Sequence, residues 1–416
     1  MRRLSFIMNQ QEALLPHLFR TEFRKITATL CKWFGIEHLD VAEDIASETF
    51  LLAAESWPYK GIPENPTAWL YTVAKNKAKN YLRRTHLFDE KIARQLQLSP
   101  TQPWEIEITE QSITDSQLQM LFAVCHPTIP IEAQISLALR ILCGFGIDEI
   151  ATAFLTNKDT INKRLFRAKE KLRLQALPIE LPSPTEIHQR LSTVLTTLYL
   201  LFNEGYYSES QDVVLREDLC IEAMRLTYLL IENEQTNLPA VNALFSLMCF
   251  HASRFPARKN SQGDLVLYPD QDESLWNNEL IAKGIYYLRQ ASQGDHLTKY
   301  HLEANIAYWH TQKADTSEKW ETILQLYNRL LQVEYSPIAA LNRTFALSKA
   351  RGKGVAIMEA EQLQLTTNQY YYTLLGELYK DTNVQKAFSS FQTAYALAKT
   401  QADKQAILKK MDELSR

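Results

Sequence analysis

Residues 147–173 form the segment that most restricts the fold of this chain. The stretch IDEIATAFLTNKDTINKRLFRAKEKLR has apolar residues at helical spacing on both sides of a break at 155–158, which predicts a short helix, a tight turn and a longer helix. Asp159 is placed to cap the longer helix. The residues predicted to face inward are Ile150, Ala151, Phe154, Ile161, Leu165 and Ala168. The segment therefore predicts a helix-turn-helix.

The outer face of the longer helix is basic. Residues 158–173 contain seven Lys or Arg and two acids. Such a helix can lie in the DNA major groove, where base edges are chemically distinct and flanking cations meet phosphates. The residues predicted to face outward are Asn162, Lys163, Arg164, Phe166, Arg167, Lys169 and Lys171. The alternative interpretation is a solvated basic helix in an all-α protein.

A second basic helix is predicted over residues 67–84. Its apolar stripe is Ala68, Leu70, Val73, Ala74, Ala78 and Leu82, and its cations are Lys75, Lys77, Lys79, Arg83 and Arg84. Asn76 and Asn80, four residues apart, can hydrogen-bond to base edges. Cations interleaved with aromatic residues (Trp69, Tyr71 and Tyr81) suit melting or single-stranded DNA. Trp69 can instead be a core anchor, and the cations can be a solvated face.

An acidic helix is predicted at 41–57, before a break at 58–66 with three prolines and a glycine. Its acidic flank carries Asp40, Glu43, Asp44 and Glu48, with Ser47 beside them, while Ile45, Thr49, Leu52 and Ala53 are predicted to face inward. The functional interpretation is a docking face for a basic partner. Acids early in a helix also favour its dipole, so the alternative is a role in stability alone.

The whole chain has few of the residues that form turns, with 11 glycines and 15 prolines in 416 residues, which favours an all-α fold. No apolar stretch approaches the roughly 20 residues that a bilayer requires, so no membrane partner is expected. The five cysteines are scattered without a CxxC pair. That pattern supports neither zinc nor disulfides and predicts a cytoplasmic location.

The order of acidic helix, proline break, basic-aromatic helix, linker and helix-turn-helix resembles the extracytoplasmic-function (group 4) sigma factors of the sigma-70 family. DVAEDIASETFLLAA is similar to region 2.2 of that family, and NPTAWLYTVAKNKAKNYLRR to regions 2.3 and 2.4. DEIATAFLTNKDTINKRLFRAKEKLR is similar to region 4.2. The resemblance covers residues 9–174. One departure is Asn80, which occupies a position that is commonly acidic in region 2.3.

The resemblance implies two macromolecular partners, core RNA polymerase (its β′ and β subunits) and promoter DNA. The polymerase set is Asp40, Glu43, Asp44 and Glu48. The −10 set is Asn76, Lys77, Asn80, Arg83 and Arg84, and the loop 59–65 is expected to help hold a flipped base. The −35 set is Asn162, Lys163, Arg164, Phe166 and Arg167, with Arg164 on a phosphate or in packing. No catalytic residue, metal ligand or cofactor is expected.

Residues 187–416 extend beyond the usual end of that family and are predicted to be helical. LLGELYKDTNVQKAFSSFQTAYALA resembles a degenerate tetratricopeptide repeat, and SPIAALNRTFALSKARG resembles the start of another. Stacked helix pairs of this kind offer a concave surface for a protein or peptide regulator. The alternative is a purely structural appendage. Residues 263–276 are interpreted as a solvated loop, and the aromatic stretch 199–210 as core packing.

The predicted domains are region 2 at 9–86, a linker at 87–114, region 4 at 115–174, a hinge at 175–186 and a regulatory helical domain at 187–416. Within region 4, Asp115 is predicted to cap a helix that runs to Val124, and a second helix is predicted at 131–142. The predicted function is that of a sigma factor which binds core polymerase and directs initiation at specific promoters. The alternative is a stand-alone helix-turn-helix regulator with a helical sensor domain. An enzyme is disfavoured, since the chain has no phosphate loop, nucleophile elbow, HExxH or GxGxxG motif.

Overall fold

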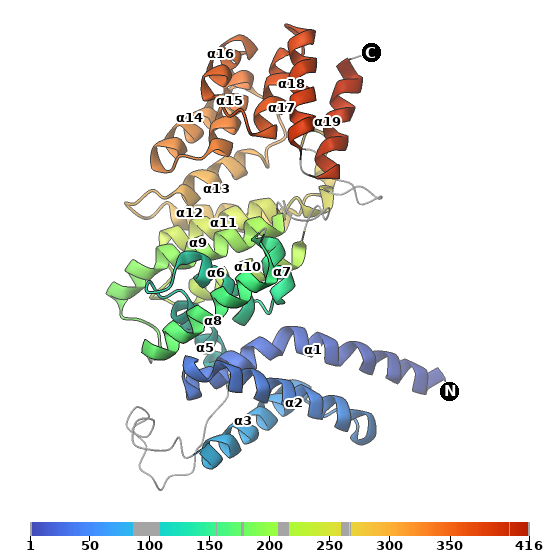
Figure 1. Cartoon of the computed structure of the whole chain (residues 1–416), viewed down its shortest axis with the longest axis vertical. Coiled ribbons are helices and arrows are strands. Elements are labelled where there is room, and N and C mark those ends of the chain that lie inside the picture. The colour runs from blue at the N-terminus through green and yellow to red at the C-terminus, as the bar shows by residue number, and fades with distance from the viewer. Residues whose placement is uncertain are drawn as a thin grey trace. The chain divides into compact units, whose positions relative to one another are not determined.

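Helices are the only regular elements in the parts of the chain that the computed structural model describes (Figure 1). These parts are residues 2–85, 109–154, 156–175, 179–206, 216–258, 266, 268–398 and 400–414. The prediction of an all-α fold is confirmed. The chain forms two compact units, residues 1–197 and 198–416.

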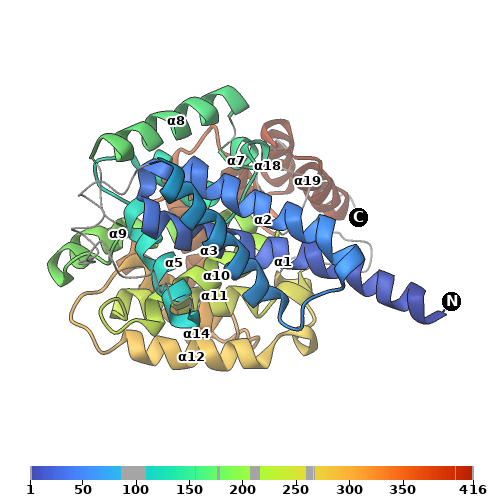
Figure 2. The same ribbon diagram turned by 90° about the horizontal axis from the view of Figure 1, so that it is seen from below.

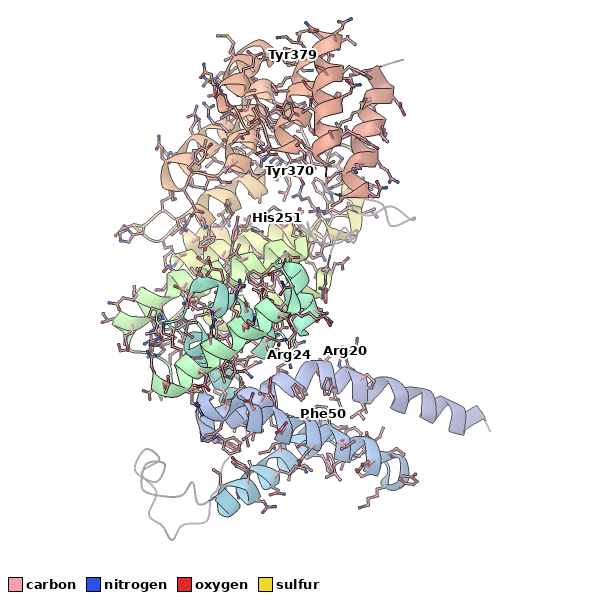
Figure 3. The ribbon with its side chains drawn as sticks, viewed as in Figure 1. Arg20, Arg24, Phe50, His251, Tyr370 and Tyr379 are labelled. Carbon is pink, nitrogen blue, oxygen red and sulfur yellow. The ribbon has the colours of Figure 1, made fainter. Side chains whose placement is uncertain are left out.

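Three helices build the N-terminal bundle of the first unit: α1 (Arg2–Phe34), α2 (Leu39–Lys60) and α3 (Pro66–Thr85), with the short helix η1 (Ile36–His38) before α2. Figure 2 shows the three long helices side by side. Phe50 of α2 turns toward α1 (Figure 3), where its ring lies 5.1 Å from that of Phe19. Gly61, with φ of 84°, ends α2 by adopting a backbone conformation that disfavours other residues. The break predicted before α3 is therefore present, although Pro58 still lies in the last turn of α2.

The described residues from 109 to 175 contain the helices α5 (Glu110–Val124), α6 (Ile131–Ile141), α7 (Ile147–Ala153) and α8 (Lys158–Gln175). The predicted start of α5 at Asp115 is wrong, because Thr109 caps it. The Thr109 hydroxyl accepts from the Ser112 amide at 3.1 Å, and the Ser112 hydroxyl accepts from the Thr109 amide at 3.0 Å. Residues 110–114, assigned to the linker from the sequence, are thus helical.

The helix-turn-helix is formed by α7 and α8. Asn157 rather than Asp159 caps α8, since the Thr160 amide donates to Asn157 Oδ1 at 2.8 Å and Asp159 lies inside the first turn. Of the six predicted inner residues, Ile150, Ala151, Ile161, Leu165 and Ala168 are buried and Phe154 is half-buried. Hydrophobic spacing therefore located this element correctly, while the identity of its cap was missed.

Helix α9 (Pro184–Tyr206) starts in the first unit and ends in the second. Ser183 and Glu186 bond to each other at its start, and Thr197 Oγ1 lies 3.7 Å from the buried Cys125 Sγ. Ile179 and Pro182 are buried, so part of the predicted hinge is packed. The boundary between the two compact units lies within α9, after Thr197. The five domains proposed from the sequence stay a prediction.

The second unit is a series of helix pairs in which α11–α12, α14–α15 and α17–α18 make extensive contacts. Its elements are α10 (Glu217–Glu232), α11 (Pro239–Ala252), η2 (Phe255–Ala257), η3 (Tyr268–Asp270), η4 (Glu273–Leu275), α12 (Asn278–Ala291), α13 (Lys299–Trp309), α14 (Ser317–Val333), α15 (Pro337–Arg351), α16 (Lys353–Leu363), α17 (Gln369–Tyr379), α18 (Val384–Leu397) and α19 (Gln401–Leu414). Gly376 lets α17 approach the ring of Phe391 on α18. A helix pair therefore exists where the repeat was predicted, and its tetratricopeptide class stays a prediction.

The sequence predicts no segment that is long and apolar enough to span a membrane. No helix in the described ranges is both long enough and apolar enough to cross a bilayer. Within the aromatic stretch 199–210, Phe202 and Tyr206 are buried as the packing interpretation expects. Residues 207–210 lie outside the described part, as do 263–265 and 267 of the predicted loop.

Candidate nucleic-acid interface

Helix α2 presents an acidic stripe on its surface. Asp40, Asp44 and Glu48 are exposed at successive turns of the helix. Glu43 lies beside them and is partly covered; its burial raises the pKa of the carboxyl, against the opposing effect of Lys169 and Arg140. Three of the four residues of the polymerase set are thus open to a partner.

Two apolar residues extend this stripe. Ile45, Thr49 and Ala53 are buried as predicted, but Leu52 is exposed, so its predicted inward orientation is wrong. Leu51 is exposed as well. The helix turns by about 100° per residue, so a position next to an inward residue can lie at the edge of the packed face. Exposed leucines beside carboxylates suit a protein partner better than solvent alone.

Lys77 of α3 and Glu48 of α2 form an ion pair, with Lys77 Nζ 2.6 Å from Glu48 Oε2. The sequence assigned Lys77 to the −10 set and Glu48 to the polymerase set. The structure brings the two sets into contact along the α2–α3 edge. An exposed pair of this kind is weak, so either residue remains available to a partner.

The outer face of α3 carries the polar residues of the −10 set. Leu70, Ala74, Ala78 and Leu82 are buried against α1 and α2. Asn76 and Asn80 are both exposed and lie one turn apart. Arg83 and Arg84 belong to α3, and their side chains lie outside the described part of the structure. The two amides can therefore reach the same stretch of nucleic acid.

The aromatic residues of α3 pack within the bundle. Tyr71 is buried and donates its hydroxyl hydrogen to Glu22 Oε2 at 3.1 Å, and burial together with Glu22 raises the pKa of Tyr71. Trp69 meets Trp57 edge-on with ring centroids 5.4 Å apart. Tyr81 meets Phe34 in the same way at 5.7 Å. All three rings therefore pack against other side chains of the bundle, which is the alternative considered for Trp69 from the sequence.

An exposed aromatic residue lies instead at the end of α2. Tyr59 has 91% of its surface exposed, next to the loop of residues 61–65. Asn65 in this loop caps α3, because its Oδ1 accepts from the Ala68 amide at 2.9 Å. The ring of Tyr59 is thus open to a partner, in the segment 59–65 that is expected from the sequence to help hold a flipped base.

The −35 set divides between the surface and the interior of the helix-turn-helix. Asn162, Lys163 and Arg167 are exposed, and Phe166 is 67% exposed. Arg164 packs its guanidinium over the ring of Phe154 at 5.0 Å, and its Nη1 has no hydrogen-bond partner in the described part of the chain. The expectation that Arg164 acts in packing or on a phosphate fits this position.

A basic groove runs along α8 beside the start of α6. It has a volume of about 440 Å³ and contains four cations and one acid: Lys163, Arg164, Arg167, Lys171 and Glu132. Exposed cations around a groove on a recognition helix are suited to DNA phosphates. The same helix therefore presents exposed polar side chains together with a cluster of cations.

The helix-turn-helix also contacts the acidic stripe. Lys169 Nζ of α8 lies 2.7 Å from Asp40 Oδ1 and 3.9 Å from Glu43 Oε2. Arg24 of α1, labelled in Figure 3, lies against Gly144 in the turn between α6 and α7. Gly144 has φ of 68°, which favours glycine at this close approach. The first unit thus brings together residues from the polymerase set and from the helix of the −35 set.

Metal chemistry has no candidate site in the ranges that the structure describes, since no group of three His, Cys, Asp or Glu side chains there could hold an ion.

Comparisons with known proteins address both units. Residues 18–87, from α1 through α3, match the family model described as Sigma-70 region 2. Residues 190–292, from α9 through the end of α12, match a family of unknown function, DUF6596. An uncharacterized protein of Rhizobium meliloti (strain 1021) is 33% identical over 391 residues, which cover 91% of each chain. No solved structure matches the chain.

The Sigma-70 region 2 match contains all of the polymerase set and the whole −10 set. The similarity to the Rhizobium meliloti protein extends over both units. The chain therefore belongs to the same family as that protein, and its Sigma-70 region 2 supports its assignment as a sigma-70 family factor with a role in transcription initiation.

Proposed function

We propose that the protein is a cytoplasmic promoter-specificity subunit of the extracytoplasmic-function type. The acidic stripe of α2 binds core RNA polymerase, α3 and Tyr59 bind the −10 element, and α8 reads the −35 element. The protein has no catalytic activity of its own in this proposal. The second unit, with its stacked helix pairs, regulates this activity by binding a protein or peptide.

The observation that carries the proposal is the combination of two faces in one compact unit. Helix α2 exposes Asp44 and Glu48, α3 exposes Asn76 and Asn80, the Lys77–Glu48 ion pair joins the two helices, and the family match covers both. The basic groove of α8 supplies a second surface for nucleic acid. A stand-alone regulator would need the second surface and would have no use for the first.

Run-off transcription tests this function directly. Core polymerase plus the full chain should initiate from defined positions on a library of DNA fragments, and core polymerase alone should not. Asp44→Lys should remove binding to core polymerase, because it reverses a charge at the centre of the acidic stripe. Glu180→Lys is the matched control, since Glu180 is an exposed acid of the same unit far from α2 in the sequence.

The two functions predict opposite results in the binding assay. A sigma factor binds core polymerase as the wild type and as Glu180→Lys, but not as Asp44→Lys. A stand-alone regulator binds DNA equally well in all three forms and fails to bind core polymerase. That second pattern would reject the proposed function.

Regulation by the second unit is tested by truncation after Tyr206, where α9 ends. This position preserves the part of α9 that is packed in the first unit, including Thr197. Promoter output from the truncated chain should differ from that of the full chain, in either direction. Unchanged output together with unchanged binding to core polymerase would argue against a regulatory role.

A further inference from the structure

The side chain of Tyr268 lies at the centre of a cluster of cations and aromatic rings in the second unit. Its ring is 5.5 Å from the Arg254 guanidinium carbon and 5.6 Å from Lys319 Nζ. His310 meets the ring edge-on at 5.2 Å, and Trp276 stacks on it with centroids 6.3 Å apart. We call these five residues the Tyr268 cluster; His251, labelled in Figure 3, marks the neighbouring part of α11.

Both cations of the Tyr268 cluster are buried without a carboxylate. Arg254 is 7% exposed and Lys319 is 2% exposed, yet neither forms an ion pair with any residue in the described ranges. Arg254 Nη2 donates to the Tyr206 hydroxyl at 3.1 Å and lies 3.4 Å from His251 Nδ1. Lys319 donates to the Tyr268 hydroxyl at 3.3 Å and to a backbone carbonyl. These partners are neutral, so they do not compensate the two charges.

The acid that acts on Lys319 is already engaged elsewhere. Asp315 accepts hydrogen bonds from the Trp320 indole and from Lys349, whose Nζ lies 3.1 Å from Asp315 Oδ2. The hydrogen bond from Trp320, together with Lys349 and Lys319, lowers the pKa of Asp315, so its one negative charge is shared among these groups. The Tyr268 cluster therefore has more positive than negative charge.

Three buried polar atoms of the Tyr268 cluster have no hydrogen-bond partner among the described residues. They are Arg254 Nε, Trp276 Nε1 and His310 Nδ1. The first two can only donate, so each requires an acceptor when it is buried. Burial, Arg254 and Lys319 lower the pKa of His310 to about 3, so its ring is neutral at physiological pH and can donate from one nitrogen. Donors from three separate segments thus surround the same ring.

We infer that the Tyr268 cluster binds the anionic group, a carboxylate or a phosphate, of a small ligand. Arg254 and Lys319 supply the charge, and Arg254 Nε, Trp276 Nε1 and His310 Nδ1 supply directed hydrogen bonds. The rings of Tyr268 and Trp276 exclude water from the anion, which strengthens each contact. This ligand site belongs to the second unit and does not depend on the proposed role in transcription.

Inorganic phosphate and succinate are suitable probes for the full chain. Each is titrated at constant ionic strength, with chloride as the balancing anion, while the thermal unfolding midpoint is followed. At least one probe should raise the midpoint in a saturable way. A response to phosphate alone identifies a phosphoryl ligand, and a response to succinate alone identifies a carboxylate ligand. Both outcomes support the site.

Variants show whether the response comes from this cluster. Arg254→Gln should weaken the probe's apparent affinity by about tenfold or more, because it removes a charge-assisted contact. Arg289→Gln, which removes an exposed cation of α12, should leave the affinity unchanged. If Arg254→Gln does not fold, Lys319→Met provides the same comparison. A flat response to both probes, or equal affinity in wild type and the cluster variant, would overturn the inference.

Discussion

Lys169 and Asp40 form an ion pair between the helix that carries the −35 set and the helix that carries the polymerase set, with 2.7 Å between Lys169 Nζ and Asp40 Oδ1. Lys169 also lies 3.9 Å from Glu43. In the proposed function, these two acids bind core polymerase. The contact with α8 and binding of polymerase therefore require the same carboxylates.

Lys169→Glu should increase binding of the protein to core polymerase in the absence of DNA. The substitution replaces attraction to Asp40 by repulsion and frees the acidic stripe. An exposed ion pair contributes up to about 1 kcal/mol, so the gain should be about fivefold at most and should shrink at high salt. Titration of a fluorescently labelled chain with core polymerase at low and high salt measures it.

Lys171→Glu is the control for that experiment. Lys171 is exposed on the same helix, so the change in net charge is identical. In the described structure no ion pair joins it to Asp40 or Glu43. Equal gains in the two variants would show that net charge, rather than this contact, sets the affinity for polymerase.

Phe166→Ala and Leu165→Ala should affect different properties of α8. Phe166 is largely exposed, so its loss should weaken binding to −35 DNA and leave the unfolding midpoint nearly unchanged. Leu165 is buried between α8 and its neighbours, so its truncation should cost about 2–5 kcal/mol of unfolding free energy. Fluorescence anisotropy with promoter DNA and chemical denaturation separate the effects. Loss of stability in Phe166→Ala would contradict its placement on the surface.

Periodicity in the sequence was sufficient to locate α3, α6 and α8 and to identify most of their buried residues. A helix that packs on one side repeats its apolar residues every three or four positions, and this signal is local. The starts of α5 and α8 were harder to predict. Asp115 and Asp159 are good capping residues by type, but Thr109 and Asn157 are equally competent, and only backbone geometry decides which one caps the helix.

Contacts between distant segments could not be predicted from the sequence. The pairing of Tyr71 with Glu22, and of Lys169 with Asp40, depends on how separate helices are aligned, which no local pattern encodes. An aromatic side chain can pack in a core or stack on a base, so residue type alone cannot decide between these two roles for the aromatic residues of α3. Their packing against rings and side chains of α1 and α2 depends on how those helices are placed.

Gly376→Ala should destabilise the α17–α18 pair. A Cβ at Gly376 would lie 2.5–2.7 Å from three atoms of the Phe391 ring, which is fully buried and cannot turn aside. Overpacking of this kind costs about 1–3 kcal/mol of unfolding free energy. Denaturant unfolding of the second unit measures it, with Gly354→Ala as the control. A Cβ at Gly354 meets nothing within 4 Å, so an equal loss in both variants would contradict the close approach of the two helices.

Glu303 of α13 should make the stability of the second unit depend on pH. Burial raises the pKa of Glu303 from 4.5 to about 7, while Tyr199, which donates to its Oε1 at 3.2 Å, partly opposes the shift. Between pH 4.5 and about pH 7, the Glu303 carboxyl is ionised in the unfolded chain and protonated in the folded chain. The free energy of unfolding should therefore fall as pH rises through this window, by at most about 1.4 kcal/mol per pH unit.

Glu303→Gln should remove this pH dependence, because the amide stays neutral and can still accept from Tyr199. The variant should match the wild type below pH 4.5 and exceed its stability above pH 7. Glu318→Gln, which neutralises an exposed acid in the first turn of α14, should keep the slope of the wild type. Denaturation across this pH range compares the three proteins, and parallel curves for wild type and Glu303→Gln would show that Glu303 ionises normally in the folded state.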